Sequence, residues 1–154
     1  MDNGYLGTDI AFMRDFDMQA DGDTALSSGL DCLSQDLVHA LTTPKGDLWY
    51  DPSYGVDIYK YLKAENTQTQ RLALELEIIV TIEVDPRVVA GSARASVRSW
   101  DLHKINIEAS CRPFGQSNRL NMVLGYAPNA FEATVRPSVA TAPLVNPLTS
   151  AVPV

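Results

Sequence analysis

Histidine and cysteine side chains can bind a metal ion or serve as a nucleophile and its base, and this chain has two of each: His39, His103, Cys32 and Cys111. A metal site needs such residues clustered at ligand spacing, and here each stands alone in the sequence. The cysteines form no C-x-x-C pair, so we predict two buried free thiols, with one disulfide between them as the alternative. The sequence therefore predicts no metal site.

Paired carboxylates are a second source of chemistry, because a glycosidase needs only two of them. Glu75, Glu77, Glu83 and Asp85 lie close together. On a helix Glu75 and Glu77 would point in different directions, so we interpret these residues as solvated charges on a partly exposed element. No serine stands in a G-x-S-x-G turn, and no P-loop or dinucleotide fingerprint occurs. We predict no catalytic residues and no cofactor.

Composition narrows the class of protein further. The 154 residues, 45% of them hydrophobic, suffice for one domain with a real core. The net charge of -7 disfavours nucleic acid as a partner, since phosphate contacts need a basic face. No apolar run is long enough to cross a bilayer, and residues 1–10 lack the basic residue of a secretory signal. We expect a soluble, intracellular, single-domain protein.

The first half of the chain predicts helices. Apolar residues recur at helical spacing from Leu30 to Leu41, and Ser27 or Ser28 is the expected N-cap. Pro44 ends this helix, because a proline pushes the preceding residue out of the helical region. A short second helix is expected from about Val56 to Leu62.

One long apolar segment fits two conformations. From Leu72 to Ile82 the hydrophobic residues alternate, as in a strand. Asn66 or Thr67 as a cap, Gln70 three residues after Thr67, and the length of the segment favour a helix instead. Periodicity alone leaves both conformations open.

The second half predicts β-strands. Alternating apolar residues cover 89–97, 105–111 and 120–124, and residues 131–135 form a short final strand. The predicted fold class is therefore α+β, with N-terminal helices packed on a small C-terminal mixed or antiparallel β-sheet.

We divide the chain into three parts. Residues 1–28 form an N-terminal arm or edge strand and a loop, and residues 29–135 form the α+β domain. Residues 136–154 form a proline-rich tail in which Arg136 is the only charged side chain. Such a segment cannot build its own core, so it is a flexible tail or an arm that orders against a neighbour.

Three short turn motifs stand in a characteristic order. Thr43-Pro44-Lys45-Gly46 follows the first helix, Asp51-Pro52-Ser53-Tyr54-Gly55 comes next, and Asp85-Pro86-Arg87 follows the long apolar segment. In this order the chain, from Gly7 to Val135, resembles the gene-W/gene-25 family of contractile phage tail baseplate wedge proteins. One departure is that the Glu-Pro-Arg of the family reads Asp85-Pro86-Arg87 here, which shortens the acidic side chain by one methylene.

The resemblance implies a fold like the conserved domain of the tail sheath protein, and a helix from about Thr67 to Glu83. It also implies that the acidic-proline-arginine motif attaches the protein to the wedge core, and that the C-terminal strands offer sheet edges to the first sheath ring. The implied partner-binding residues lie in the three turn motifs: Asp85, Pro86, Arg87, Pro44, Gly46, Pro52, Tyr54 and Gly55.

The function that the resemblance implies is structural. The protein would be a baseplate subunit of the virion tail, assembled in the host cytoplasm and present in several copies in a ring. Its partners would be other baseplate wedge proteins and the tail sheath protein, with hub or tube proteins as further candidates and no nucleic acid or membrane. The alternatives are the equivalent subunit of a type VI secretion or pyocin-like injection system, a lysozyme-like enzyme that cleaves peptidoglycan, and an unrelated α+β binding module.

Overall fold

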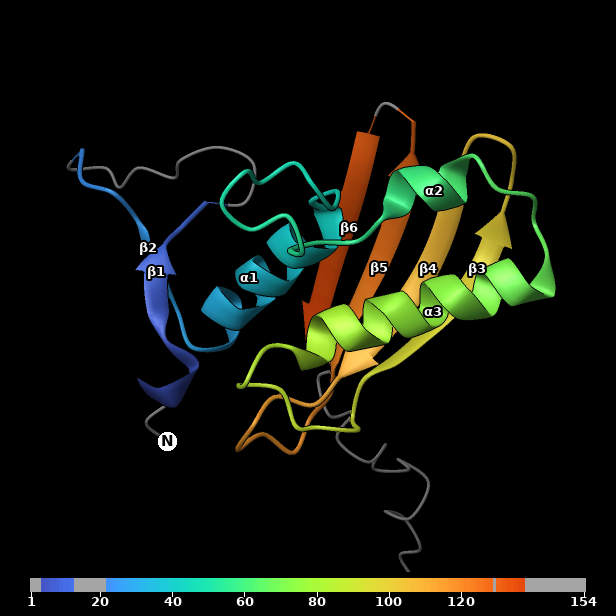
Figure 1. The fold of residues 1–154 in the computed structure, drawn as a ribbon. Helices are drawn as coiled ribbons and strands as arrows, with labels where there is room; N and C mark the ends of the chain where they lie inside the picture. The colour runs from blue at the N-terminus through green and yellow to red at the C-terminus, as the bar shows by residue number, and fades with distance from the viewer. Residues whose placement is uncertain (1–3, 13–21, 129, 138–154) are drawn as a thin grey trace, which may run out of the picture.

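The computed structural model describes residues 4–12, 22–128 and 130–137 and places helices on one face of a four-stranded sheet (Figure 1). The helical elements are η1 (Gly4–Leu6), α1 (Leu30–Thr42), α2 (Ile58–Leu62) and α3 (Gln68–Glu83). The strands are β1 (Thr8–Ile10), β2 (Leu26–Ser28), β3 (Arg94–Trp100), β4 (Ile105–Cys111), β5 (Leu120–Ala127) and β6 (Ala130–Pro137). Strands β3 to β6 form an antiparallel meander in sequence order. The predicted α+β class is confirmed, and the sheet is antiparallel.

The core lies between the helices and the inner face of the sheet. In β4 the side chains of Ile105, Ile107, Ala109 and Cys111 are buried, because every second residue of a strand points to the same face. The helices contribute a matching set of buried side chains: Leu33, Leu37, Leu41, Leu74, Ile78 and Ile82. The two cysteines are buried free thiols, as predicted. Within the described residues, no helix combines the length and apolar character needed to cross a membrane.

The N-terminal segment agrees with its prediction only in part. β1 is a short strand, as one of the two expected alternatives had it, but its partner β2 replaces the end of the predicted loop. Because Ser27 and Ser28 belong to this strand, neither caps α1. The N-cap is Gly29, which has a φ of 63° and makes no side-chain cap bond. Residues 13–21 of the predicted arm and loop, and residues 138–154 of the predicted tail, lie outside the described residues.

The ambiguous apolar segment is the helix α3. Of the two expected caps, Asn66 and Thr67, the structure uses Thr67, whose side chain accepts a hydrogen bond from the Gln70 backbone N–H. The helix ends at Glu83, immediately before Val84 and the Asp85-Pro86 step. Its apolar residues lie on two opposite sides, which explains why their spacing imitated a strand.

The start of β3 also differs from its prediction. The expected strand began at Val89, whereas β3 begins at Arg94. Val88 instead makes an isolated bridge to Pro113, and Gly91 turns the chain with a φ of 73°. This turn allows the chain after α3 to reverse direction before it enters the sheet.

Candidate partner-binding surface

The acidic-proline-arginine motif follows α3 directly and forms an internal ion-pair network. The guanidinium of Arg87 donates from Nε to Asp85 Oδ1 at 2.9 Å and from Nη2 to Asp36 Oδ2 at 2.7 Å. Its Nη1 donates to the Leu6 carbonyl at 3.0 Å. Arg87 therefore joins α1, the N-terminal turn and its own loop, while Pro86 beside it stays exposed.

Asp85 and Arg87 each shift the pKa of the other in the direction that favours its charged form. Burial by itself raises the pKa of the Asp85 carboxyl, but the hydrogen bonds and charge of Arg87 outweigh burial and hold that pKa below its ordinary value of 3.8. Hydrogen bonds to Asp85, and then to Asp36, raise the pKa of the Arg87 guanidinium despite its partial burial. Both groups are ionised across the physiological pH range.

The other two predicted turn motifs lie side by side. Pro44 and Val56 form a parallel bridge, in which the Lys45 N–H donates to the Val56 carbonyl and the Val56 N–H donates to the Thr43 carbonyl, both at 3.1 Å. Gly55 has a φ of 97° at the point where the two backbones meet, so it is a position that only glycine fits. Backbone hydrogen bonds therefore hold the first turn motif against the end of the second.

Tyr54 links the second turn to the acidic corner. Burial raises the pKa of its hydroxyl, and the nearby charges of Asp36, Tyr50, Asp85 and Asp51 raise it further. Three carboxylates therefore lie close enough to this half-buried ring to act on its hydroxyl. The predicted residues Asp85, Arg87 and Tyr54 thus belong to one charged cluster.

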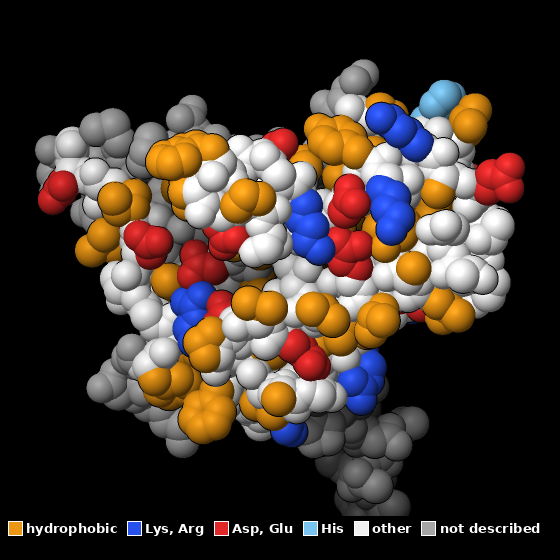
Figure 2. All heavy atoms as spheres, in the orientation of Figure 1, with side chains coloured by type: hydrophobic (Ala, Val, Ile, Leu, Met, Phe, Trp, Pro, Cys, Tyr) orange, Lys and Arg blue, Asp and Glu red, His pale blue; other side chains and the backbone are white. Residues whose placement is uncertain are grey.

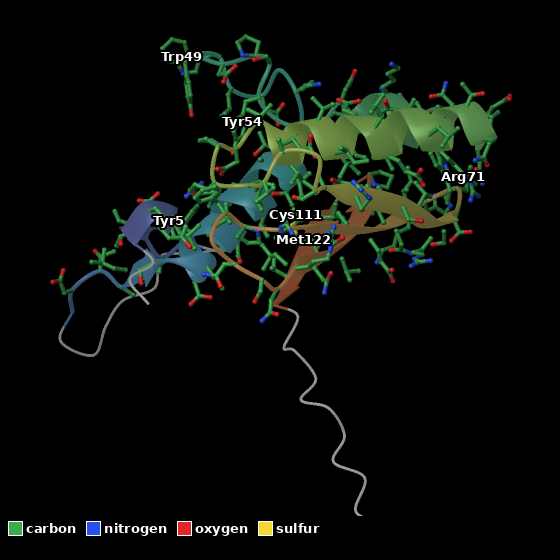
Figure 3. All side chains as sticks on the ribbon, turned by 90° about the horizontal axis from the view of Figure 1, so that it is seen from below. Tyr5, Trp49, Tyr54, Arg71, Cys111 and Met122 are labelled. Carbon is green, nitrogen blue, oxygen red and sulfur yellow. The ribbon has the colours of Figure 1, made fainter. Side chains whose placement is uncertain are left out.

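The remaining predicted residues are distributed around this cluster. Pro44 is buried at the bridge, whereas Gly46 and Pro52 are exposed at the tips of their turns. Trp49 was not among the predicted site residues, although it is 87% exposed, and it packs edge-to-face on Tyr50 with ring centroids 5.7 Å apart. Figure 3 shows Trp49 at the outer tip of the loop and Tyr54 closer to the helices. Asp36 was also missed, because nothing in its helical surroundings distinguishes it from a solvated residue.

The glutamates of α3 are not solvated charges, contrary to the prediction. Glu77 accepts hydrogen bonds from Lys45 Nζ, the Asp57 N–H and the Tyr61 hydroxyl, at 2.8 to 2.9 Å. Burial raises the pKa of Glu77, but these bonds and the Lys45 charge lower it overall. The carboxylate therefore remains ionised and joins α3 to the loop and to α2.

Glu75 and Glu83 bind the free edge of β3. Glu75 accepts the Val97 N–H at 2.8 Å, and Glu83 accepts the Ala93 N–H at 3.2 Å. At the far end of the same edge, the Asn66 amide donates to the Trp100 carbonyl at 3.1 Å. These side chains occupy backbone groups that a neighbouring strand would otherwise use.

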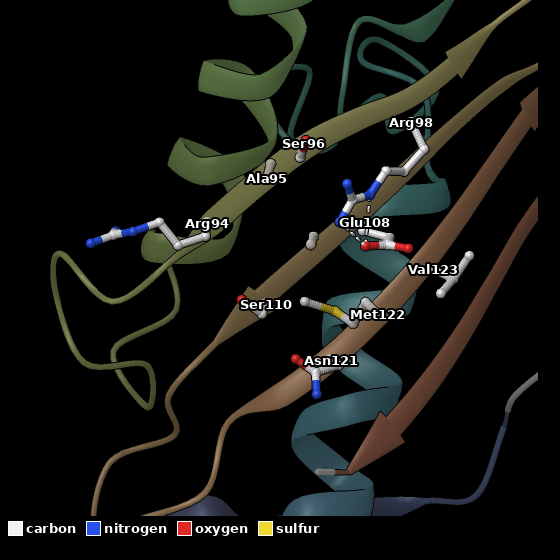
Figure 4. A pocket seen from close by; sticks show the side chains of 10 residues that line it. Arg94, Ala95, Ser96, Arg98, Glu108, Ser110, Asn121, Met122 and Val123 are labelled. Atoms are coloured by element: carbon white, nitrogen blue, oxygen red, sulfur yellow. Dashed lines mark hydrogen bonds and ion pairs between the residues drawn. The ribbon is translucent and has the colours of Figure 1, made fainter.

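The outer face of the sheet, which points away from the helices, carries polar side chains around a shallow hollow (Figure 4). Arg98 and Glu108 form an exposed ion pair across β3 and β4. Within the described residues, no group of three or more His, Cys, Asp or Glu side chains is arranged to hold a metal ion. This face offers polar contacts but no arrangement that indicates chemistry.

A family model described as contractile injection system sheath initiator matches residues 8–92, a range that contains all three turn motifs. None of the curated proteins matches the chain. Among solved structures, the chain is similar to a putative tail lysozyme from Geobacter sulfurreducens, with 22% identity and a TM-score of 0.56. This similarity covers 67% of the present chain and 94% of the other, and at such low identity it bears on the fold alone.

Proposed function

Because the chain belongs to the family of contractile injection system sheath initiators, we propose that it acts without catalysis, as a baseplate subunit that binds a neighbouring wedge protein and starts sheath assembly. The matched range covers more than half of the chain and includes the turn motifs. The single observation that supports the assembly role is a difference between the two edges of the sheet. Side chains are bound along the β3 edge, whereas none of the described strands pairs with the β6 edge.

The blocked edge is β3. Its outward backbone groups at Ala93, Val97 and Trp100 are already bound by Glu83, Glu75 and Asn66. A strand from another chain would have to displace these side chains, which makes pairing at β3 unfavourable.

The opposite edge is β6, and none of the described strands pairs with its outer side. Val97, Ile107, Leu124 and Ala133 form one row across the sheet. Since the Val97 N–H points outward to Glu75, the alternation of an antiparallel ladder makes the Ala133 N–H point outward at the β6 edge. We propose that an extended segment of the sheath protein pairs there, by strand addition.

The wedge contact is proposed at the corner after α3. The Arg87 guanidinium donates hydrogen bonds to Asp85, Asp36 and the Leu6 carbonyl, so its role there is to stabilise the loop after α3. Pro86 and the tips of the two turns at Gly46 and Pro52 are exposed, and we propose them as the contact surface for a wedge protein. Several copies would form a ring in the tail baseplate, assembled in the host cytoplasm, in a phage or in a related injection system.

A proline at the β6 edge tests the assembly role. Ala133→Pro removes the outward N–H and places ring atoms where the incoming strand would lie, while leaving the β5–β6 ladder bonds in place. We expect folded protein by circular dichroism but tails without polymerised sheath by electron microscopy. The matched control is Ala95→Pro, whose N–H points outward at the blocked β3 edge and which should leave sheathed tails. Normal sheaths with Ala133→Pro would contradict the proposal.

Peptidoglycan cleavage is the competing activity, because the similar solved structure is described as a putative tail lysozyme. A glycosidase needs one carboxyl that is protonated at working pH, whereas Glu77 has a lowered pKa. Glu75 and Glu83 are each bound to a backbone N–H of β3. We expect purified protein to release no soluble fragments from peptidoglycan. Activity that Glu75→Gln, Glu77→Gln or Glu83→Gln abolishes would replace the structural role with an enzymatic one.

A further inference from the structure

Helix α3 is apolar on two opposite sides. Leu74, Ile78 and Ile82 face the core and are fully buried. On the outer side, four aliphatic residues at every fourth position are more than half exposed: Leu72 (54%), Leu76 (61%), Val80 (55%) and Val84 (76%). We name this row the α3 ridge. A contiguous row of exposed aliphatic side chains is uncommon on a protein that has no partner and is typical of a contact surface.

The ridge is part of a larger apolar face. Figure 2 shows hydrophobic side chains in a row over α3, on the side of the molecule opposite the open face of the sheet. At the C-terminal end of the ridge, Val80 and Val84 line a hollow shared with Ala40 and Tyr54. Trp49 projects beside this end, farther from the sheet than α3 itself (Figure 3). A partner lying along the ridge would therefore meet a hollow and an exposed indole at one end.

That end is also negatively charged. Asp36, Asp51 and Asp85 surround Tyr54, and Arg87 is the cation bound among them. Three carboxylates against one guanidinium leave a net charge of -2. The nearby Lys45 is neutralised by Glu77. Between Leu72 and Val80 the charged side chains Glu75 and Glu77 are half-buried and bound to the Val97 N–H and to Lys45, so the acidic cluster at the C-terminal end is the main charge beside the ridge.

We propose that the α3 ridge binds an α-helix of a baseplate partner, one with an aliphatic face and basic residues at the end that lies over Asp51 and Asp85. A row at i, i+4, i+8 and i+12 is the ridge that fits the groove between equivalent rows of another helix, at a crossing angle of about -50°. The basic end follows from charge complementarity with the acidic end. A second copy is disfavoured as the occupant, because it carries the same net charge of -7 and the same acidic end.

A model peptide tests this chemistry without requiring the natural partner. The probe is an alanine-rich helix of about 20 residues with leucines along one face and two arginines at one end. Binding to the full chain is measured by fluorescence anisotropy. We expect Leu76→Gln to weaken binding about tenfold, or about 1.4 kcal/mol, because the variant removes an aliphatic side chain that the contact would bury. The matched control is Val123→Gln, an exposed aliphatic residue of β5 on the outer face of the sheet, which should bind like the unmodified chain.

The charge requirement and the second-copy alternative are tested with the same variants. A peptide with glutamates in place of the arginines should bind more weakly, and added salt should reduce the difference. Equal binding of the peptide to Leu76→Gln and to the unmodified chain would overturn the proposal. A dimer seen by sedimentation velocity and lost in Leu76→Gln would also overturn it, in favour of a second copy.

This inference rests on the proposed function only in naming a baseplate protein as the source of the helix. Its failure is distinguishable from failure of sheath initiation, because Ala133→Pro changes the β6 edge and leaves the residues of the α3 ridge unchanged. We expect Ala133→Pro to bind the peptide normally while losing the sheath, and Leu76→Gln to bind the peptide about tenfold more weakly with an intact β6 edge.

Discussion

Gly55→Ala is expected to lower the free energy of unfolding by about 3 kcal/mol, from overpacking combined with an unfavourable backbone conformation. A Cβ at this position would overlap the Thr43 carbonyl oxygen and lie 3.0 Å from the Thr43 carbonyl carbon. These are backbone atoms of the bridge between the two turns, so they cannot move aside as a side chain would. The φ of 97° at this position adds further strain, because residues that carry a Cβ rarely adopt a positive φ of this size. Urea denaturation followed by circular dichroism measures the loss.

Gly46→Ala is the matched control. Gly46 has a similar φ of 91°, but a Cβ there meets no atom within 4 Å. The expected cost is therefore the backbone conformation alone, about 1 kcal/mol. Equal losses for the two variants would mean that the close approach at Gly55 is not what requires glycine.

Arg87→Ala is expected to cost the fold about 3 kcal/mol, because it leaves two partly buried carboxylates without their cation. The Arg87 guanidinium holds Asp85, Asp36 and the Leu6 carbonyl together, and each belongs to a different segment. Arg87→Lys should recover part of the loss, since an ammonium keeps the charge but cannot reproduce the fork geometry. Urea denaturation of the three proteins at neutral pH provides the comparison.

Arg98→Ala supplies the control for charge removal in general. Arg98 pairs with Glu108 on the open face of the sheet, where the two side chains are 61% and 51% exposed. An exposed pair contributes between zero and about 1 kcal/mol. Equal losses in the free energy of unfolding for Arg98→Ala and Arg87→Ala would mean that the ion-pair network of Arg87 does not stabilise the fold more than an exposed ion pair does.

This network changes how the acidic-proline-arginine motif is understood. The resemblance implied a motif that reaches outward to the wedge. In the structure the polar groups of Asp85 and Arg87 bind each other and their own chain, and Pro86 is the exposed member. If Arg87→Ala fails to enter the baseplate, the cause could therefore be loss of folded protein. The urea denaturation of the same variant shows how much of the protein remains folded.

Local spacing in the sequence determined the extents of several elements. The first helix was expected to end before Pro44 and does so at Thr42, and the alternation over 105–111 matches β4 in full. These predictions were correct because each element buries only one face against the core. Its apolar residues therefore recur with the spacing of a helix or of a strand. The long segment ending at Glu83 was ambiguous for the opposite reason, since α3 carries apolar residues on two sides.

Tertiary packing alone decided the candidate surface. Asp36 and Arg87 are 51 residues apart, and Glu75 and Val97 are 22 apart, so neither pairing has a local signature. The same holds for the choice between β3 and β6 as the open edge, which depends on where α3 lies over the sheet. Sequence by itself determined that the chain folds as helices on a small sheet and carries the turn motifs of its family. Only the structure decided which side chains those motifs bind and which surfaces remain open, because such contacts depend on how distant segments pack.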